Sequence, residues 1–151
     1  MIGKERNGSI QLAEKRMQEN EKYVLDSHAV LCFFYGEAGA KRVKALLKSA
    51  QGGETKIWMS WINAGEVYYS LYRNQGKSSA EHAIALLKTY PIQWVEINEK
   101  NVFAAAELKA LHPIAYADCF VATIALQNRA TVITGDSEFK ELEKKISIEG
   151  L

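Results

Sequence analysis

Short apolar runs alternate with longer amphipathic stretches along most of this chain. The apolar runs predict strands over residues 22–26, 56–60, 91–95 and 131–134, and a last edge strand over 146–148. The stretches between them predict helices over 30–35, 37–50, 61–74, 78–89, 98–111 and 138–145, with a further buried helix that begins near Ala115. Because strands that alternate with helices form a parallel sheet covered on both faces, we expect a three-layer α/β/α sandwich with a central parallel sheet.

Two of the predicted helices each carry one acid in an apolar sequence. Asp118 lies in the first turn of the helix that begins near Ala115. An acid there either interacts with the positive end of the helix dipole and with water, or serves a site. Glu66 is the only charged residue of the helix 61–74 before Arg73. Both helices therefore carry a carboxylate on an apolar scaffold.

Two further acids directly follow predicted strands. Asp26 ends the run 22–26 and precedes Ser27, a pattern typical of a helix start. Asp136 comes just after the strand 131–134. In an open parallel sheet, ligands bind beyond the carboxyl ends of the strands. We therefore expect four acids to meet at one edge of the sheet: Asp26, Glu66, Asp118 and Asp136.

Such a cluster is costly without a cation, because carboxylates that lie close together raise one another's pKa values and oppose ionisation. Mg²⁺ and Mn²⁺ prefer carboxylate oxygens and water as ligands, and one or two such ions can activate a water and orient a phosphodiester. Each acid also has a simpler interpretation. Asp26 and Asp136 could be cap or turn residues, Asp118 could stabilise a helix dipole, and Glu66 could pair with Arg73 or a tyrosine hydroxyl.

Composition limits the remaining possibilities. A chain of 151 residues with 48% hydrophobic residues is long enough for one domain, which we expect over 21–151, after a polar extension over 1–20. The chain has no apolar run long enough to span a membrane and no signal-peptide core, so we expect a cytoplasmic protein without membrane partners. Cys32 and Cys119 are too few for a disulfide framework and have no zinc-site spacing, so we interpret both as small apolar residues.

Four motifs resemble those of PIN-domain ribonucleases of the VapC toxin type. They are Tyr23-Val-Leu-Asp26-Ser, Asn63-Ala-Gly-Glu66-Val, Ala117-Asp118-Cys-Phe-Val-Ala-Thr-Ile-Ala125 and Ala130-Thr-Val-Ile-Thr134-Gly-Asp136-Ser-Glu-Phe139, and the resemblance covers roughly residues 22–151. It implies that the four acids are the catalytic, metal-binding residues, that the Thr134 hydroxyl supports them, and that Ser27 is the small polar residue after the first acid.

The same resemblance implies a function. The reaction would be Mg²⁺- or Mn²⁺-dependent hydrolysis of single-stranded or loop RNA by metal-activated water, leaving a 5′-phosphate and a 3′-hydroxyl. The protein would be the toxin of a toxin–antitoxin pair, inhibited by a VapB-type antitoxin, and a homodimer.

The net charge of +1 gives no overall attraction for RNA, so any phosphate contacts must be local. Lys41 and Lys44, with Lys48, lie on one face of a predicted helix, although a simple solvated face is the better explanation of this stripe, and Arg73 is another candidate. Aromatic residues at 33–35, 58, 61, 68, 69 and 72 exceed what a core needs, and some could line a dimer interface or an antitoxin groove.

Three other classes of protein compete with this interpretation. Phosphatases of the haloacid dehalogenase type and receiver domains also place Asp after the first strand, but they need further acids where this chain has His28. A flap-DNA nuclease would need threading elements for which the chain is short. The remaining alternative is a non-catalytic RNA-binding or protein-interaction module with the same fold.

Overall fold

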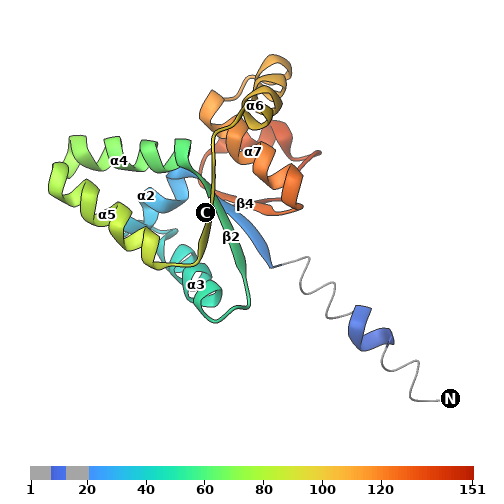
Figure 1. The fold of residues 1–151 in the computed structure, drawn as a ribbon, viewed down its shortest axis with the longest axis horizontal. Coiled ribbons are helices and arrows are strands. Elements are labelled where there is room, and N and C mark those ends of the chain that lie inside the picture. Colours follow the sequence, from blue (N-terminus) through green and yellow to red (C-terminus); the bar gives the residue numbers. More distant parts are fainter. Residues whose placement is uncertain (1–7, 13–20) are drawn as a thin grey trace.

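A computed structural model describes residues 8–12 and 21–151 of the chain (Figure 1). The predicted extension over residues 1–20 lies mostly outside the described residues, so the boundary near residue 20 stays a prediction. Within the part of the chain that the structure describes, no helix is long and apolar enough to cross a lipid bilayer.

The centre of the fold is a parallel sheet of five strands in the order β3-β2-β1-β4-β5. The strands are β1 (Lys22–Leu25), β2 (Lys56–Ser60), β3 (Ile92–Val95), β4 (Thr131–Thr134) and β5 (Ile148–Gly150). β1 lies in the middle, where Val24 aligns with Trp58 of β2 and with Val132 of β4. All strands run the same way, so their carboxyl ends share one edge, as predicted.

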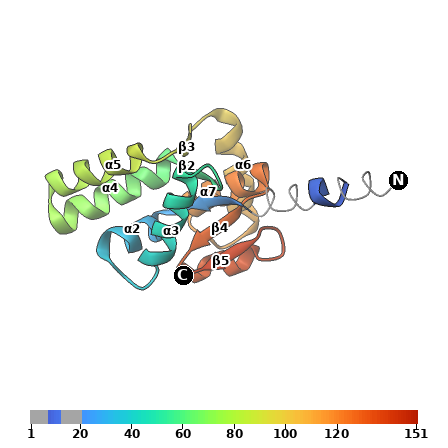
Figure 2. The ribbon, with the colours of Figure 1, turned by 90° about the horizontal axis from the view of Figure 1, so that it is seen from below.

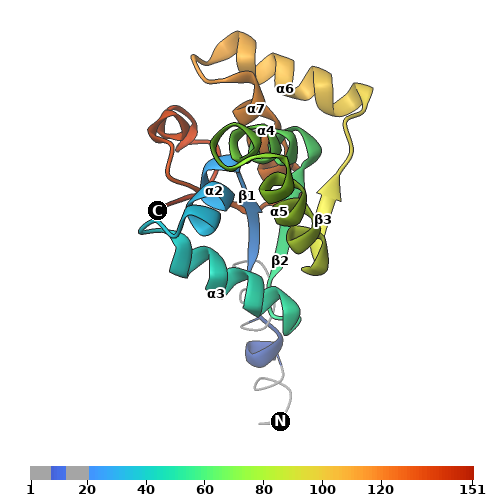
Figure 3. The same cartoon turned by 90° about the vertical axis from the view of Figure 1, so that its left-hand side faces the viewer.

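Helices cover both faces of the sheet (Figures 2 and 3). The helices are α2 (Ser27–Tyr35), α3 (Ala40–Gln51), α4 (Trp61–Gln75), α5 (Lys77–Thr89), α6 (Glu99–Leu111) and α7 (Tyr116–Asn128). Alternate strand residues point to opposite faces: Leu25 and Ile133 pack with α2–α5, whereas Val24 and Val132 pack with α6 and α7. The predicted three-layer sandwich is therefore confirmed.

α7 is the most buried helix of the sandwich, with every residue from Asp118 to Ala125 buried. Figure 1 shows it between the sheet and α6. A helix enclosed in this way needs apolar residues all round, which explains why its sequence has almost no amphipathic pattern. The predicted buried helix is confirmed, and its first turn brings Asp118 to the edge of the sheet.

Two predictions near the end of the chain were wrong in detail. Residues 138–145 do not form an α-helix; Ser137–Leu142 form a 3₁₀-helix, η1, followed by turns. The buried residues of η1 are Phe139 and Leu142, and this three-residue spacing matches the period of a 3₁₀-helix. The last strand begins at Ile148 instead of 146, because the Ile146 N–H donates to the Leu142 carbonyl and so belongs to the preceding turn.

Two helix starts also differ from the prediction. α2 begins at Ser27, as the helix-start pattern after Asp26 indicated, and so earlier than the predicted stretch 30–35, because the Asp26 side chain caps it. α3 begins at Ala40 instead of 37, since Gly36 ends α2 with a left-handed φ of 66° and the next residues form a turn. Ser60 caps α4, with its Oγ accepting the Ile62 N–H at 3.1 Å.

Candidate functional site

Asp26 lies at the carboxyl end of the central strand and is only 1% exposed. Its Oδ1 accepts the Ala29 N–H at 2.7 Å, which caps α2, and its Oδ2 accepts the hydroxyl of Thr134 on β4. Burial raises the pKa of Asp26 to about 6, against the lowering effect of these hydrogen bonds. The cap interpretation is therefore correct, and it leaves the carboxylate at the predicted edge.

Thr134 connects the two acids that follow strands. Besides donating to Asp26, its Oγ1 accepts the backbone N–H of Asp136 at 2.9 Å. The Asp136 carboxylate in turn accepts the Glu138 N–H at 2.9 Å and so caps η1. The structure thus places Thr134 where the supporting hydroxyl was expected, between Asp26 and Asp136.

Asp118 is buried and is held differently. Its side chain is 8% exposed, yet its carboxylate has no hydrogen-bond partner among residues 8–12 and 21–151. Burial, and then the negative charges of Asp136, Asp26, Glu66 and Glu138, together raise the pKa of Asp118 to about 7. The other three predicted acids, Asp26, Glu66 and Asp136, therefore all act electrostatically on Asp118 at this edge of the sheet.

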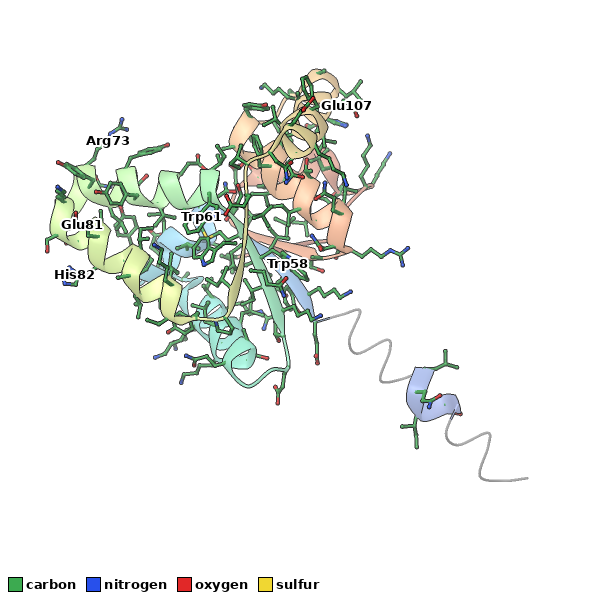
Figure 4. All side chains as sticks on the ribbon, viewed as in Figure 1. Trp58, Trp61, Arg73, Glu81, His82 and Glu107 are labelled. Atoms are coloured by element: carbon green, nitrogen blue, oxygen red, sulfur yellow. The ribbon has the colours of Figure 1, made fainter. Side chains whose placement is uncertain are left out.

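Glu66 lies half-buried in the second turn of α4. Its Oε1 accepts the side-chain N–H of Asn63, one turn earlier, at 3.0 Å. It does not pair with Arg73, whose exposed guanidinium lies 4.9 Å from the centre of the Tyr69 ring. Figure 4 shows Arg73 pointing outward at the far end of α4. The expected alternative partner of Glu66 is therefore not used.

Glu138 is an acid that our sequence analysis missed. Carboxylate oxygens of Asp118, Asp136 and Glu138 all lie within 4.8 Å of one another. Glu138 Oε2 also accepts the backbone N–H of Ala115, at the start of α7, at 3.2 Å. Its position two residues after Asp136 was a usable signal, but Glu138 was assigned to the predicted helix over 138–145 and not to the site.

His28 and Gly135 pack closely beside these acids. A Cβ atom on Gly135 would come within 2.3 Å of His28 Cε1, so the exposed imidazole lies directly against the glycine. A side chain at position 135 would displace the ring from its place near Asp26. A larger residue at position 135 would therefore be accommodated only if the exposed His28 ring moved.

The donor set fits a hard divalent cation. The converging side chains supply carboxylate oxygens, the ligands that Mg²⁺ and Mn²⁺ prefer, and the Asp118 carboxylate lacks a protein partner in the described chain. The cysteines do not join them. Cys32 donates to Glu37 Oε2 at 3.3 Å, and burial raises its pKa to about 11, so it stays a neutral thiol, whereas Cys119 is buried in the core.

The residues predicted to bind substrate are not gathered as closely as the acids. Ser27 begins α2 next to Asp26. Lys41 and Lys44 are exposed on α3 and, like Arg73, make no contact with the acids in the described part of the chain. Arg42 beside them is engaged in two hydrogen bonds to Glu149, of 2.7 and 2.9 Å.

The structure is an α/β sandwich with a five-stranded parallel sheet. Acidic side chains gather at the carboxyl edge of the sheet, where proteins of this class bind ligands. The sequence matches the PIN domain family over residues 23–145, and the chain belongs to that family. No curated protein matches the sequence significantly.

Solved structures with the same fold include several toxin–antitoxin proteins. VapBC2 from Rickettsia felis, bound to a DNA fragment from its promoter, is 18% identical over 85% of this chain and 98% of its own, with a TM-score of 0.65. VapC20 from Mycobacterium tuberculosis, described as a sarcin–ricin loop cleaving toxin, is 17% identical over 78% and 92%, with a TM-score of 0.64. VapBC-1 from Haemophilus influenzae is 23% identical over 85% and 97%, with a TM-score of 0.62. These similarities show the PIN fold over nearly the whole of each relative.

Proposed function

We propose that this protein is a metal-dependent endoribonuclease that acts as the toxin of a toxin–antitoxin pair. The observation that carries the proposal is the convergence of Asp118, Asp136 and Glu138 within 4.8 Å, beside the buried Asp26. Membership of the PIN domain family and the likeness to VapC structures support the same function. The catalytic, metal-binding residues in this proposal are Asp26, Glu66, Asp118 and Asp136, with Thr134 as the supporting hydroxyl.

The cation would be Mg²⁺ or Mn²⁺. When bound, it would neutralise the carboxylates, orient a phosphodiester and favour ionisation of an attacking water. The chain itself supplies the geometry. Thr134 fixes the Asp26 carboxylate by its hydroxyl, and the N–H of Glu138 fixes that of Asp136, so both acids are held before any ligand arrives.

RNA is the proposed substrate. One structure of the same fold is described as a sarcin–ricin loop cleaving toxin, which supports this class of substrate. Ser27, next to Asp26, is the proposed phosphate contact nearest to the acids. Lys41, Lys44 and Arg73 are exposed and free to contact a longer RNA further from the cleaved bond.

The partners follow from the toxin role. A VapB-type antitoxin is proposed because similar structures are VapBC complexes, and we also propose a homodimer in the cytoplasm. Growth arrest upon expression, relieved by co-expression of an antitoxin encoded beside this gene, would support the toxin role. Normal growth despite expression of an active nuclease would contradict it.

The decisive experiment is cleavage of total RNA with Mn²⁺, by the wild type and by Asp136→Asn. The asparagine keeps an oxygen that can accept the Glu138 N–H, so the variant should fold while it loses a charge. The matched control is Glu141→Gln, since Glu141 is an exposed acid in η1, the 3₁₀-helix that Asp136 caps. We expect activity in the wild type and in the control, a loss of at least about 100-fold in Asp136→Asn, and none with EDTA.

Two outcomes would overturn the proposal. Equal activity of the wild type and Asp136→Asn would refute the metal-site mechanism. Absence of activity in every protein, together with absence of Mn²⁺ binding, would favour the alternative of a non-catalytic RNA-binding or protein-interaction module.

A further inference from the structure

Asn63 is a fully buried polar residue in an unusual position. It lies in the first turn of α4, three residues after Ser60, and has no exposed surface. Asparagine is both a poor helix former and rarely buried without partners. Its presence at this position therefore calls for a specific interaction.

Only half of the Asn63 amide is used. Its Nδ2 donates to Glu66 Oε1 at 3.0 Å, whereas its Oδ1 is the one buried side-chain polar atom without a hydrogen-bond partner in the described part of the chain. Reversing the amide does not help, because a carboxylate only accepts hydrogen bonds and would then face the amide oxygen. The unpartnered oxygen thus accompanies the bond to Glu66.

Glu66 depends on this bond more than the other acids depend on any single contact. Asp26 has two hydrogen-bond donors and Asp136 has a backbone donor, all from groups fixed by strand or helix ends. Glu66 has a longer side chain, and among the described residues its hydrogen-bond donor is Asn63. The spacing of three residues places both side chains on one side of α4.

We propose that Asn63 is a positioning residue that holds the Glu66 carboxylate toward the acids Asp26, Asp118 and Asp136. A leucine has the same branching and would fill this buried position without an unpartnered oxygen. An amide is needed here for its N–H donor. The inference rests on the proposed function, since it assigns Asn63 to the cation site of the nuclease.

The test compares Asn63→Leu with a matched control, Asn101→Leu, without RNA present. Asn101 is also a buried helical asparagine, but its Nδ2 donates to the Glu96 carbonyl and its Oδ1 accepts from Gln127, so both halves of its amide are used. Melting temperature is measured in EDTA and then during a Mn²⁺ titration, which reports the cation concentration that gives half of the stabilisation.

We expect the two variants to respond in opposite ways. Asn63→Leu should melt in EDTA at or above the wild-type temperature, because it removes an unpartnered polar atom, yet need at least about tenfold more Mn²⁺, as is usual when a partner of a metal ligand is lost. Asn101→Leu should melt lower and keep the wild-type Mn²⁺ midpoint. RNA cleavage by Asn63→Leu should fall by about tenfold or more.

Two results would overturn the inference. One is a lower melting temperature of Asn63→Leu in EDTA with an unchanged Mn²⁺ midpoint, which would make Asn63 structural. If Asn63→Leu does not fold, Asn63→Ala is measured in its place. An unchanged Mn²⁺ midpoint in Asn63→Ala would refute the positioning role of Asn63. The other is a wild type that Mn²⁺ does not stabilise, since Asn63 would then have no ion site to serve. A wild type that binds Mn²⁺ but cleaves no RNA would refute only the nuclease.

Discussion

Asp26 at the end of β1 and Asp118 in the first turn of α7 are both buried carboxylates, but their surroundings differ. Asp26 accepts hydrogen bonds from Ala29 and Thr134, whereas Asp118 accepts none within residues 8–12 and 21–151 and faces other acids. The first acid therefore contributes to the fold as well as to the site. The second lies in the fold without such bonds, and burial and the nearby acids disfavour its ionised form, which a bound cation would stabilise.

The largest expected effect comes from removing the acid that the fold uses. Asp26→Ala loses the cap of α2 and leaves the buried Thr134 hydroxyl without its acceptor, so we expect unfolding free energy to fall by about 2–4 kcal/mol. Denaturant unfolding in EDTA measures this loss. Asp26→Asn keeps an oxygen that can accept the Ala29 N–H and should lose clearly less; an equal loss in both variants would show that the hydrogen bonds of Asp26 do not support the fold.

Replacing Asp118 is expected to raise the unfolding free energy, whereas replacing Asp26 lowers it. Asp118→Asn removes a buried charge that has no partner and relieves repulsion from Asp136, so without metal it should gain about 1 kcal/mol of stability. The same variant should lose stabilisation by Mn²⁺. Thermal unfolding with EDTA and then with Mn²⁺ measures both effects. A large drop in melting temperature without metal would instead make Asp118 structural and remove the contrast with Asp26.

The pH dependence of stability tests the same comparison through the pKa values of Asp26 and Asp118, with a smaller expected effect than the substitutions. In the folded protein the pKa values are raised to about 6 for Asp26 and about 7 for Asp118, from 3.8. At pH values between 3.8 and these raised pKa values, the folded state therefore binds more protons than the unfolded state. This contribution to stability is present at low pH and is lost as the pH rises from about 4 to 7.

Comparing the wild type with Asp118→Asn in EDTA isolates this contribution. The gain in stability of the variant should vanish near about pH 4 and reach its full value above about pH 7, where Asp118 of the wild type is ionised. Urea unfolding at several pH values measures the difference. A gain that is constant across this range would mean that the Asp118 carboxyl group is not the source.

The sequence was sufficient to predict the order of the elements, and two of the four predicted acids, Asp118 and Asp136, lie in the group of three carboxylates within 4.8 Å of one another. β1 and β4 are short apolar runs with an acid within two residues of their ends, so the strand ends placed Asp26 and Asp136. Asp118 stood out in a helix that is apolar on nearly all sides. Glu66 stood out in the same way in α4. These residues were predictable because each differs from the local pattern around it.

What the sequence did not reveal depends on packing between distant segments. Glu138 joins Asp118 only because η1 is a 3₁₀-helix set by the burial of Phe139 and Leu142, which propensity alone does not indicate. The link from Thr134 to Asp26 requires that β4 pairs with β1, 108 residues earlier in the chain. The role of Asn63 became visible only through its burial and its unpartnered oxygen.

The most direct test of the central claim is anomalous diffraction from crystals of this protein soaked in Mn²⁺. We expect a manganese peak bounded by the carboxylates of Asp118 and Asp136, near Asp26 and Glu66, and its loss in crystals of Asp118→Asn. An absence of manganese at this edge of the sheet, or a peak that persists unchanged in the variant, would contradict a metal centre built from these acids.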